Sequence, residues 1–482
     1  MNGEPERQYA EGAPLTSGTS PVDLAEMALV EAELDQRWPE TKIEPSLARI
    51  STLMDLLGSP QQGYPAIHTA GTNGKTSVTR MIDSLLTALH RRTGRITSPH
   101  LQLATERIAI DNAPITPGRY VEVYRELQPF IEMIDKQSAA AGGPAMSKFE
   151  VLTGMAYAAF AEAPVDVAVV ETGMGGTWDA TNVIDGQVAV ITPIGLDHTD
   201  YLGPDLTSIA GEKAGIIKKA ADDGLVPRDT VAVIAQQEPE AMEVLLRRAV
   251  EVDAAVAREG SEFQVLTRCV AVGGQVLELQ GLGGVYDEIF LPLHGEHQAR
   301  NAVLALAAVE AFFGAGSARQ LDIDAVRAGF AAAVSPGRME RMRSAPTIFL
   351  DAAHNPQGAQ ALAATLTTEF DFRKLVGVIA VLGDKDAGGI LDALEPVFDA
   401  IVVTENGSPR ALPVDDLANL AVQRFGDERV AVAADLADAI ETAIALAEEG
   451  EDGEMVSGSG IVVTGSVVTA GAARSLFGKD PA

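Results

Sequence analysis

Short apolar runs alternate with helical patterns along most of the chain. An apolar run over residues 67–70 precedes a helical pattern over 75–89, and a run over 165–170 follows a helical pattern over 147–163. This alternation of strand and helix is typical of parallel βαβ units. The first part of the chain is therefore predicted to form a mostly parallel sheet covered by helices.

The pattern changes between residues 262 and 292, where polar and apolar positions alternate and glycines interrupt them, which favours antiparallel hairpins. Helical patterns follow, and five apolar runs then appear, at 347–350, 375–382, 400–404, 430–433 and 461–464. We predict an α/β protein in which a mostly parallel domain over 21–336 carries a small antiparallel sheet. A smaller Rossmann-like α/β domain is predicted over 337–482.

Composition narrows the class of protein. The 482 residues are 46% hydrophobic, enough for a large core, yet the longest apolar runs are far shorter than the ~20 residues of a membrane helix. Residues 1–20 are polar and lack the features of a signal peptide, so we interpret them as a disordered tail on a cytoplasmic protein. The net charge of −32 would repel nucleic acid and anionic membranes, so neither is an expected partner.

The segment GTNGKTS, from Gly71 to Ser77, follows an apolar strand and opens a helix, the context that a phosphate-binding loop (P-loop) requires. Its glycines let backbone amides approach an anion, Lys75 can neutralise terminal phosphates, and the hydroxyl of Thr76 can reach a Mg²⁺ ion. The alternative is an ordinary glycine turn between strand and helix. The positions of the lysine and the hydroxyl favour the P-loop, which makes the first domain a P-loop-containing domain.

Further candidate ligands follow the next strands. Glu171 stands at the end of one apolar run beside flexible glycines, and Asp197 and His198 follow another. Ligands of open α/β sheets bind at this edge, so Glu171 is a candidate Mg²⁺ ligand and His198 a candidate ligand of a second metal ion. Taken alone, Glu171 fits an exposed strand end equally well, and Lys213 would be a solvated lysine.

Polar groups also gather on a later helix and in the second domain. His297, Arg300 and Asn301 share one helix face, which can hold a nucleotide base or form a capped polar surface. The loops of the second domain repeat this polar character, over 336–338, 350–356, 383–386, 408–410 and 464–466. Cations and donors from both domains are therefore expected to converge on one cleft.

With these residues identified, the chain resembles the folylpolyglutamate synthase and dihydrofolate synthase family, a branch of the Mur ligase superfamily, along nearly its full length beyond the tail. The resembling segments occur in the family's order, over 70–77, 97–101 with 106–108, 171–182 (ETGMGGTWDATN), 195–203 (GLDHTDYLG), 212–216, 297–302, 336–340, 350–356 and 383–386. Several such blocks are much harder to meet by chance than one glycine motif.

The resemblance implies roles for individual residues. The ATP phosphates would contact Asn73, Gly74, Lys75, Thr76 and Ser77, and the rest of the nucleotide would contact Asn301, Arg338, Asp351 and, near the ribose, Asp384 or Asp386. Mg²⁺, with two ions expected, would be held by Ser98, Glu171, His198 and Lys213, the last being a lysine that the family carbamylates. The pteridine substrate would face Phe149, Glu150, Trp178, Asp179 and Ala180.

The implied reaction joins L-glutamate to the carboxylate of dihydropteroate or a reduced folate. That carboxylate attacks the γ-phosphate of ATP, and the glutamate amine then opens the acyl phosphate. Because a dianionic amino acid in so acidic a protein needs local cations, the candidates for binding the glutamate carboxylates and the intermediate are Arg107, His354, Arg410 and Ser466. The groups expected to take part in catalysis are Lys75, Arg107, Glu171, His198, Lys213 and His354. The resemblance also implies a monomer.

Two other functions stay open. Thr76 stands where many family members have glycine, so the loop also fits a Mur-type ligase that adds an amino acid to a UDP-linked peptidoglycan precursor. The segment ETGMGGTWDATN, and SPHL with ERI, favour the folate branch. The second alternative is a non-catalytic nucleotide-dependent regulator, which would release ADP and phosphate but form no amide.

Overall fold

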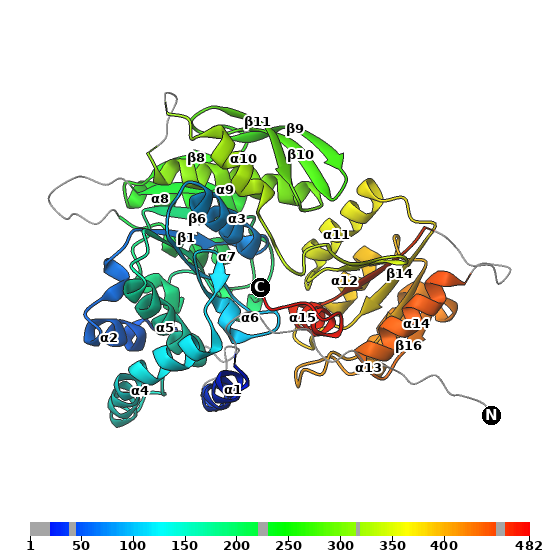
Figure 1. Ribbon diagram of the computed structural model, residues 1–482, viewed down its shortest axis with the longest axis horizontal. Helices are drawn as coiled ribbons and strands as arrows, with labels where there is room; N and C mark the ends of the chain where they lie inside the picture. The colour runs from blue at the N-terminus through cyan, green and yellow to red at the C-terminus, as the bar shows by residue number, and fades with distance from the viewer. Residues whose placement is uncertain (1–19, 38–44, 220–229, 315–318, 450–457) are drawn as a thin grey trace.

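The computed structural model describes residues 20–37, 45–219, 230–314, 319–449 and 458–482, which form two lobes on separate sheets (Figure 1). The expected disordered tail lies outside these residues except for Ser20. The Ser20 hydroxyl accepts a hydrogen bond from the Asp23 amide at 3.1 Å, so this residue caps the first helix. Among the described helices, none combines the length and the apolar character needed to cross a bilayer.

The first lobe contains an eight-stranded sheet of order β4-β3-β2-β5-β1-β6-β7-β8. The strands from β2 to β8 in this order pair in parallel, and β3 and β4 continue the sheet as an antiparallel edge. The strands are β1 (Ala66–Ala70), β2 (Thr93–Ile96), β3 (Ile108–Ile110), β4 (Ala113–Pro114), β5 (Val167–Glu171), β6 (Val188–Ile191), β7 (Val231–Ile234) and β8 (Ala255–Arg258).

Helices cover both faces of this sheet because successive strand residues point to opposite sides. Ile67, Val169 and Val190 pack with α3, α9 and α10, whereas Ala168 and Val170 pack with α1, α2, α4 and α5 on the opposite face. α7 and α8 cover that second face near β6 and β7. These helices are α1 (Pro21–Asp35), α2 (Ala48–Leu56), α3 (Lys75–Ala88), α4 (Pro117–Ala140), α5 (Lys148–Glu162), α6 (Thr199–Leu202), α7 (Leu206–Lys213), α8 (Pro239–Glu251), α9 (Glu296–Phe312) and α10 (Ile323–Ala331).

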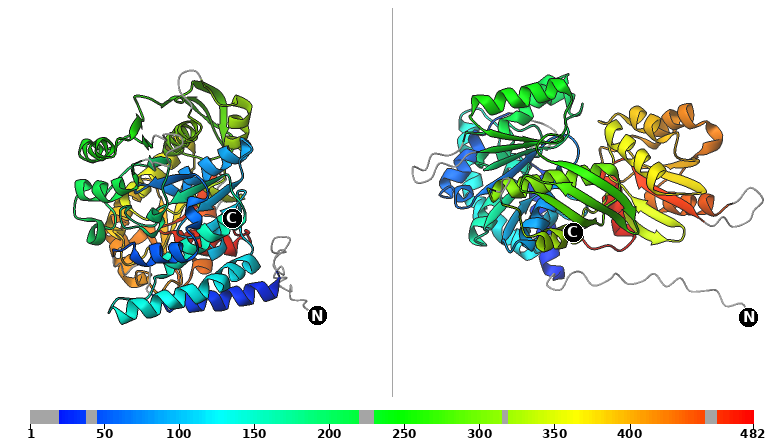
Figure 2. Two further views of the ribbon diagram at one scale, coloured as in Figure 1. Left: turned by 90° about the vertical axis from the view of Figure 1, so that its left-hand side faces the viewer. Right: turned by 90° about the horizontal axis from the view of Figure 1, so that it is seen from above.

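The glycine-interrupted segment forms a three-stranded antiparallel sheet, as predicted, from β9 (Gln264–Ala271), β10 (Gly274–Gln280) and β11 (Val285–Leu291). Its inner face packs against α9 and α10 through residues such as Leu277 and Ile289. This sheet extends toward the second lobe (Figure 2). It contacts that lobe because Arg268 of β9 forms an ion pair with Glu369, whose side chain is buried.

The second lobe is built on a six-stranded sheet of order β12-β13-β17-β14-β15-β16, parallel except for β12. One face is covered by α11, α12 and α13 and the other by α14 and α15. The strands are β12 (Glu340–Ser344), β13 (Thr347–Leu350), β14 (Lys374–Ile379), β15 (Ala400–Val403), β16 (Val430–Val432) and β17 (Ser459–Thr464), and the helices are α11 (Pro356–Glu369), α12 (Ala387–Leu394), α13 (Val414–Phe425), α14 (Leu436–Glu448) and α15 (Val467–Leu476).

The predicted fold class is confirmed, with differences in detail. The run predicted over 165–170 forms a strand that ends with Glu171, so this carboxylate belongs to the strand itself. Strand β12 was not predicted, because its sequence ERMRS carries no apolar alternation. It is an edge strand that pairs only with β13, so polar side chains on it can stay in water.

Candidate active site between the two lobes

The carboxyl ends of four neighbouring parallel strands bring the predicted site residues to one edge of the first sheet. β1 leads into the glycine-rich loop, β5 ends at Glu171, β2 leads to Ser98, and β6 leads to Asp197 and His198. The strand order β2-β5-β1-β6 makes these ends adjacent, although β2 and β6 are far apart in sequence. The topology of the sheet therefore brings the residues at these four strand ends together.

The loop between β1 and α3 turns tightly enough to face an anion. Gly74, at the N-terminus of the 14-residue helix α3, has φ of +89°, and a Cβ there would lie 2.7 Å from Asn301 Oδ1. Lys75 Nζ folds back to the carbonyl oxygens of Gly71 and Thr72, at 3.0 and 3.3 Å. A phosphate at this helix N-terminus would compete with those carbonyls for the ammonium group.

Thr76, Glu171 and Ser98 form an oxygen-rich cluster beside this loop. Thr76 Oγ1 donates to Glu171 Oε1 at 2.8 Å, and the Ser98 amide donates to Glu171 Oε2 at 3.3 Å. Burial raises the pKa of Glu171, while Lys75 and the two hydrogen bonds oppose that rise. Among the described residues, no three His, Cys, Asp or Glu side chains form a metal cage. One carboxylate with hydroxyls fits Mg²⁺, which usually takes few protein ligands plus substrate phosphates.

Lys213, at the end of α7, is buried rather than solvated as its sequence context alone suggested. Lys213 is only 4% exposed, and its Nζ donates to the Gly71 carbonyl at 2.8 Å. Burial and the positive charge of Lys75 lower the pKa of Lys213 to about 7. A substantial fraction of this lysine is therefore an uncharged, nucleophilic amine near neutral pH.

Asp197 and His198 lie where the second lobe meets this edge. Lys385, from the loop before α12, donates to Asp197 Oδ1 at 3.0 Å, and both side chains are mostly buried. Burial alone would raise the pKa of Asp197, but His198 and Lys385 together hold it well below its usual range. Burial lowers the pKa of His198 to about 4 although Asp197 opposes this, so its imidazole is neutral at pH 7.

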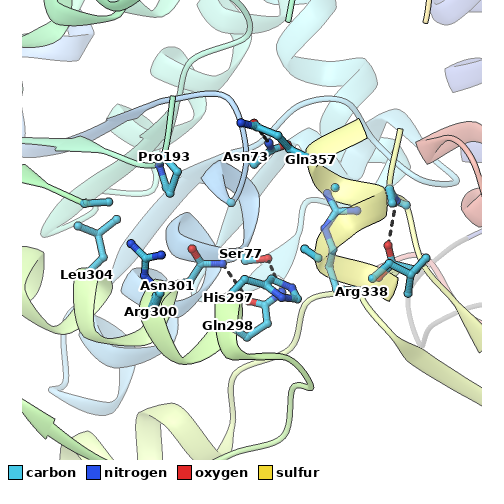
Figure 3. A pocket seen from close by; sticks show the side chains of 18 of the residues that line it. Asn73, Ser77, Pro193, His297, Gln298, Arg300, Asn301, Leu304, Arg338 and Gln357 are labelled. Carbon is cyan, nitrogen blue, oxygen red and sulfur yellow. Dashed lines mark hydrogen bonds between the residues drawn. The ribbon is translucent and has the colours of Figure 1, made fainter. Parts of the chain in front are cut away.

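A cavity between the lobes adjoins the glycine-rich loop (Figure 3). Six predicted nucleotide residues line it, namely Asn73, Gly74, Ser77, Asn301, Arg338 and Asp351, together with His354 of the second lobe. His297 and Arg300 line it as well, which brings the predicted face of α9 into the cavity. Its walls therefore come from the loop, from α9 and from the second sheet.

Direct hydrogen bonds join the lobes at the tip of the loop. Asn73, which lies beside Gln357 in Figure 3, donates from Nδ2 to Gln357 Oε1 at 3.0 Å. Asn355 Nδ2 donates to Asn73 Oδ1, also at 3.0 Å. Asn355 also caps α11 by accepting from the Gly358 amide at 2.8 Å. The N-terminus of α11 is thus fixed against the loop that faces the cavity.

Several predicted residues do not line this cavity. Asp384 and Arg410 form an ion pair at 2.8 Å with both side chains nearly half exposed, and Asp386 caps α12 through the Gly389 amide. Ser466 caps α15 and bonds to Asn406 and Thr469, so its hydroxyl is already engaged.

Two candidates for glutamate binding differ in charge. Arg107 Nε donates to His100 Nδ1 at 2.9 Å, and the residue is almost fully buried. Burial and the charge of Lys385 lower the pKa of His354 to about 4, while its Nδ1 donates to the Ala352 carbonyl at 2.9 Å. His354 is thus a neutral hydrogen-bonding group at pH 7, and it does not supply the positive charge for which it was selected.

The residues predicted to face the pteridine lie around the loop that follows β5. The ring of Phe149 packs over Gly173, where a Cβ would come within 2.6 Å of it, and Trp178 packs beside Gly175. Asp179 accepts from the Met174 and Thr181 amides, at 2.8 and 3.0 Å, and so shapes the loop that ends at the buried Ala180. Glu150 caps α5 and pairs with Arg49 at 3.2 Å, which gives it a structural role here.

Sequence reasoning missed several contacts in this region. Gln298 is buried on α9 and links Asn301 to Ser77, at 3.1 and 3.4 Å. The sequence indicated the polar loop over 383–386 but no role for its Lys385, and it indicated none for Gln357. No local signal marks these residues, because each matters only through a partner on a distant segment.

Comparisons with known proteins agree with this architecture. Residues 146–309 match the Mur ligase middle domain, and residues 337–466 match the Mur ligase glutamate ligase domain. The dihydrofolate synthase/folylpolyglutamate synthase of Mycobacterium tuberculosis is 68% identical over 470 residues, covering 96% of both chains. That of Bacillus subtilis is 34% identical, covering 78% of this chain and 84% of the relative.

A solved structure gives the same result. The folylpolyglutamate synthase of Mycobacterium tuberculosis complexed with ADP superimposes with a TM-score of 0.90 at 67% identity. The match covers 95% of this chain and 100% of that one. The architecture around the cavity is therefore shared with a nucleotide-binding relative.

Proposed function

The chain belongs to the dihydrofolate synthase/folylpolyglutamate synthase family of Mur ligases, and from that premise we propose how its site joins L-glutamate to a folate-type acid. It is an ATP-dependent ligase. The acceptors that we propose are the carboxylates of dihydropteroate and of a reduced folate, because the relative that is 68% identical carries both activities in its name. The observation that carries the proposal is the cavity bounded by the glycine-rich loop and by both lobes.

ATP is proposed to bind in that cavity. Its phosphates would accept hydrogen bonds from the loop amides and from the ammonium group of Lys75. Lys75 would exchange its present contacts with the Gly71 and Thr72 carbonyls for the bound phosphate. Asn301 of α9 and Asp351 of the second lobe both line this cavity, so they would hold the base and the ribose. Arg338, at the junction of the lobes, would add positive charge beside the phosphates, whereas Asp384 and Asp386 are weaker candidates because they lie outside the lining.

Mg²⁺ is proposed to bind at Thr76, Ser98 and Glu171, with His198 as the ligand of a second ion. When bound, the metal supplies positive charge against the phosphate oxygens. The chain's own groups prepare this position, because Glu171 is held by two hydrogen bonds and cannot turn away. His198 is neutral, as a nitrogen ligand must be.

Lys213 is proposed to carry a carbamate. An uncharged amine adds CO₂ and loses a proton, which converts a cation into a carboxylate-like group. A buried ammonium next to Lys75 would repel a metal ion, whereas a carbamate would attract one. The low pKa of Lys213 and its position beside Gly71 support this modification.

The acid and the amine are proposed to approach from the side of the loop that follows β5. Phe149 and Trp178 offer rings for a pteridine, and Asp179 and Ala180 keep that loop in place. Arg107 is the buried cation proposed for a glutamate carboxylate, and His354 would position the amino acid by hydrogen bonding. Exclusion of water by the two lobes would limit hydrolysis of the acyl phosphate.

Product analysis tests the function directly. The full chain is incubated with ATP, Mg²⁺, L-glutamate and either dihydropteroate or tetrahydrofolate, and the products are identified by mass spectrometry. We expect ADP, phosphate and an acceptor heavier by one glutamyl residue. Product formation only with a UDP-linked peptide would point to a peptidoglycan ligase instead, and ADP without any amide would point to a regulator.

The division into lobes over 21–336 and 337–482 and the monomeric state are part of the same proposal. Light scattering of the full chain tests the oligomeric state, since a dimer would double the measured mass.

A further inference from the structure

Arg474 on α15 links the two lobes through a set of hydrogen bonds. Its Nε donates to Gln102 Oε1 at 2.9 Å, its Nη1 pairs with Glu340, and its Nη2 donates to the Asp480 carbonyl at 2.7 Å. The guanidinium side chain is only 4% exposed. Gln102 belongs to the first lobe, whereas the other partners belong to the second, so this arginine spans the junction.

Gln102 completes the contact from the first lobe. Its Nε2 donates to the Lys479 carbonyl at 2.8 Å and to Ser475 Oγ at 3.3 Å. Both polar atoms of its amide are therefore engaged with the end of α15 and the segment after it. The position and the orientation of the Gln102 side chain are therefore fixed by hydrogen bonds with the second lobe.

Backbone packing at the same place is unusually close. A Cβ on Gly471 of α15 would lie 1.9 Å from the Leu101 carbonyl oxygen, so only glycine allows this approach. The Leu101 side chain packs against Gly337 of the segment that joins the lobes, where a Cβ would lie 3.3 Å away. Leu101 is held between α15 and that segment, next to Gln102.

The loop that carries Leu101 and Gln102 also carries Ser98. The buried carboxylate of Glu106 accepts from the amides of Leu101, Gln102 and Leu103 at 2.8 to 3.1 Å, and its backbone carbonyl accepts from Thr97 Oγ1 at 3.2 Å, so one residue holds both ends of this loop. At the start of the loop, the Ser98 amide contacts Glu171. These contacts connect the position of Gln102 with that of Ser98 beside Glu171.

Glu340 extends the network to the nucleotide side. Its Oε2 accepts from the Gly337 amide at 2.8 Å, while its other oxygen pairs with Arg474. Gly337 has φ of +67° and directly precedes Arg338, which lines the nucleotide cavity. One guanidinium therefore connects the segment that presents Arg338 with the loop that presents Ser98.

We propose that Arg474 and Gln102 are positioning residues, which set the Ser98 loop against Glu171 only when the two lobes are correctly apposed. The contact couples lobe orientation to the magnesium position without touching substrate or nucleotide. The inference rests on the proposed function, because it takes Ser98 and Glu171 as the metal side of a ligase.

Gln102→Ala is the variant that tests the coupling, because it removes the side-chain contacts of Gln102 with the second lobe and leaves the Arg474 to Glu340 pair intact. Displacements near 1 Å at a catalytic group can lower rates about 10²-fold, so we expect kcat to fall about tenfold, with the KM for ATP changed less than about twofold. Calorimetry of ADP binding, with and without Mg²⁺, gives a second readout. The gain in ADP affinity from Mg²⁺ should shrink in Gln102→Ala, while metal-free ADP binding stays as in the unmodified chain.

Arg429→Ala provides the matched control. Arg429 also pairs with a glutamate, Glu395, and with backbone carbonyls, but all its partners lie within the second lobe. We expect its kcat and its Mg²⁺ effect to match those of the unmodified chain, and Gly471→Ala to reproduce the Gln102→Ala result. The proposed coupling would be overturned if Gln102→Ala left both kcat and the gain in ADP affinity from Mg²⁺ unchanged. It would also be overturned if Arg429→Ala lowered both quantities as much as Gln102→Ala does. A failure of the ligase proposal would appear separately, as absence of amide product from the unmodified chain.

Discussion

Lys75 and Lys213 share one acceptor, because the Nζ atoms of both donate to the carbonyl oxygen of Gly71, at 3.0 and 2.8 Å. Two ammonium groups so close to each other repel, and Lys213 has no room to reach water. The pKa of Lys213 is lowered to about 7 by burial first and by Lys75 second. Lys75, in contrast, sits at the mouth of the loop and can move to a phosphate. The two lysines therefore have different chemistry despite their common partner.

Lys75→Ala should lower kcat for ligation about 10²- to 10³-fold, the loss typical for removal of one electrostatic donor, and should leave the fold intact. The residue is a charge at the proposed ligand site and contributes no core packing. Steady-state kinetics and the melting temperature are measured together. Lys136→Ala is the control, since it removes an exposed lysine that pairs with Glu132 on the same helix. Near-normal turnover in Lys75→Ala would contradict the site assignment.

Lys213→Ala should lose activity and recover part of it when a short carboxylic acid such as acetate is added. The added acid would occupy the space left by the carbamate and restore a negative group beside the metal position. Activity is measured over a range of acetate concentrations, with chloride as the salt control. Lys75→Ala should show no such recovery. Absence of rescue would leave the lysine without support as a carbamate carrier.

The pKa of Lys213 also predicts how stability depends on pH in buffers free of bicarbonate. In the unfolded chain the amine titrates near 10.5, and in the folded chain near 7. Below pH 7 both states hold the proton, whereas between about 7 and 10.5 only the unfolded state does, so the free energy of unfolding rises with pH in that window.

Lys213→Met removes this contribution, so its stability should change less between pH 7 and 9 than that of the unmodified chain. One proton released on folding corresponds to a slope of about 1.4 kcal/mol per pH unit. Denaturant unfolding at several pH values measures the slope for both proteins. Identical slopes would show that Lys213 keeps its ordinary pKa.

Lys385→Met should move the acidic limb of the pH–activity profile to higher pH. Lys385 is one of the charges that lower the pKa of Asp197, together with His198, and it also lowers the pKa of His198 after burial. Without this cation both groups hold their protons to higher pH, so activity that needs them deprotonated is lost sooner on acidification. The profile of kcat between pH 5 and 8 tests this shift. Lys374→Met, which removes a lysine of the second lobe whose Nζ donates to the Glu449 carbonyl, should leave the limb unchanged.

The sequence alone determined the local features of this protein. Strand and helix periodicity predicted β1, β5 and the strands β13 to β17 near their observed positions, and glycines with alternating residues predicted the antiparallel sheet. The GTNGKTS segment carried its own chemical signal, because a lysine and a hydroxyl at a helix start are recognisable from neighbours in sequence. Each of these inferences depends on residues close to one another along the chain.

Only the tertiary structure decided which distant groups meet. The strand order brings Ser98 and Thr76 to the same carboxylate, helix packing brings Lys213 to the loop of Lys75, and the contact between the lobes brings Lys385 to Asp197. It also leaves Arg410 and Asp384 paired with each other at the surface. The burial of a group and the charges around it at such contacts determine its pKa. Burial and neighbouring charges cannot be inferred from the spacing of residues along the sequence, because they depend on atoms supplied by segments far apart in sequence.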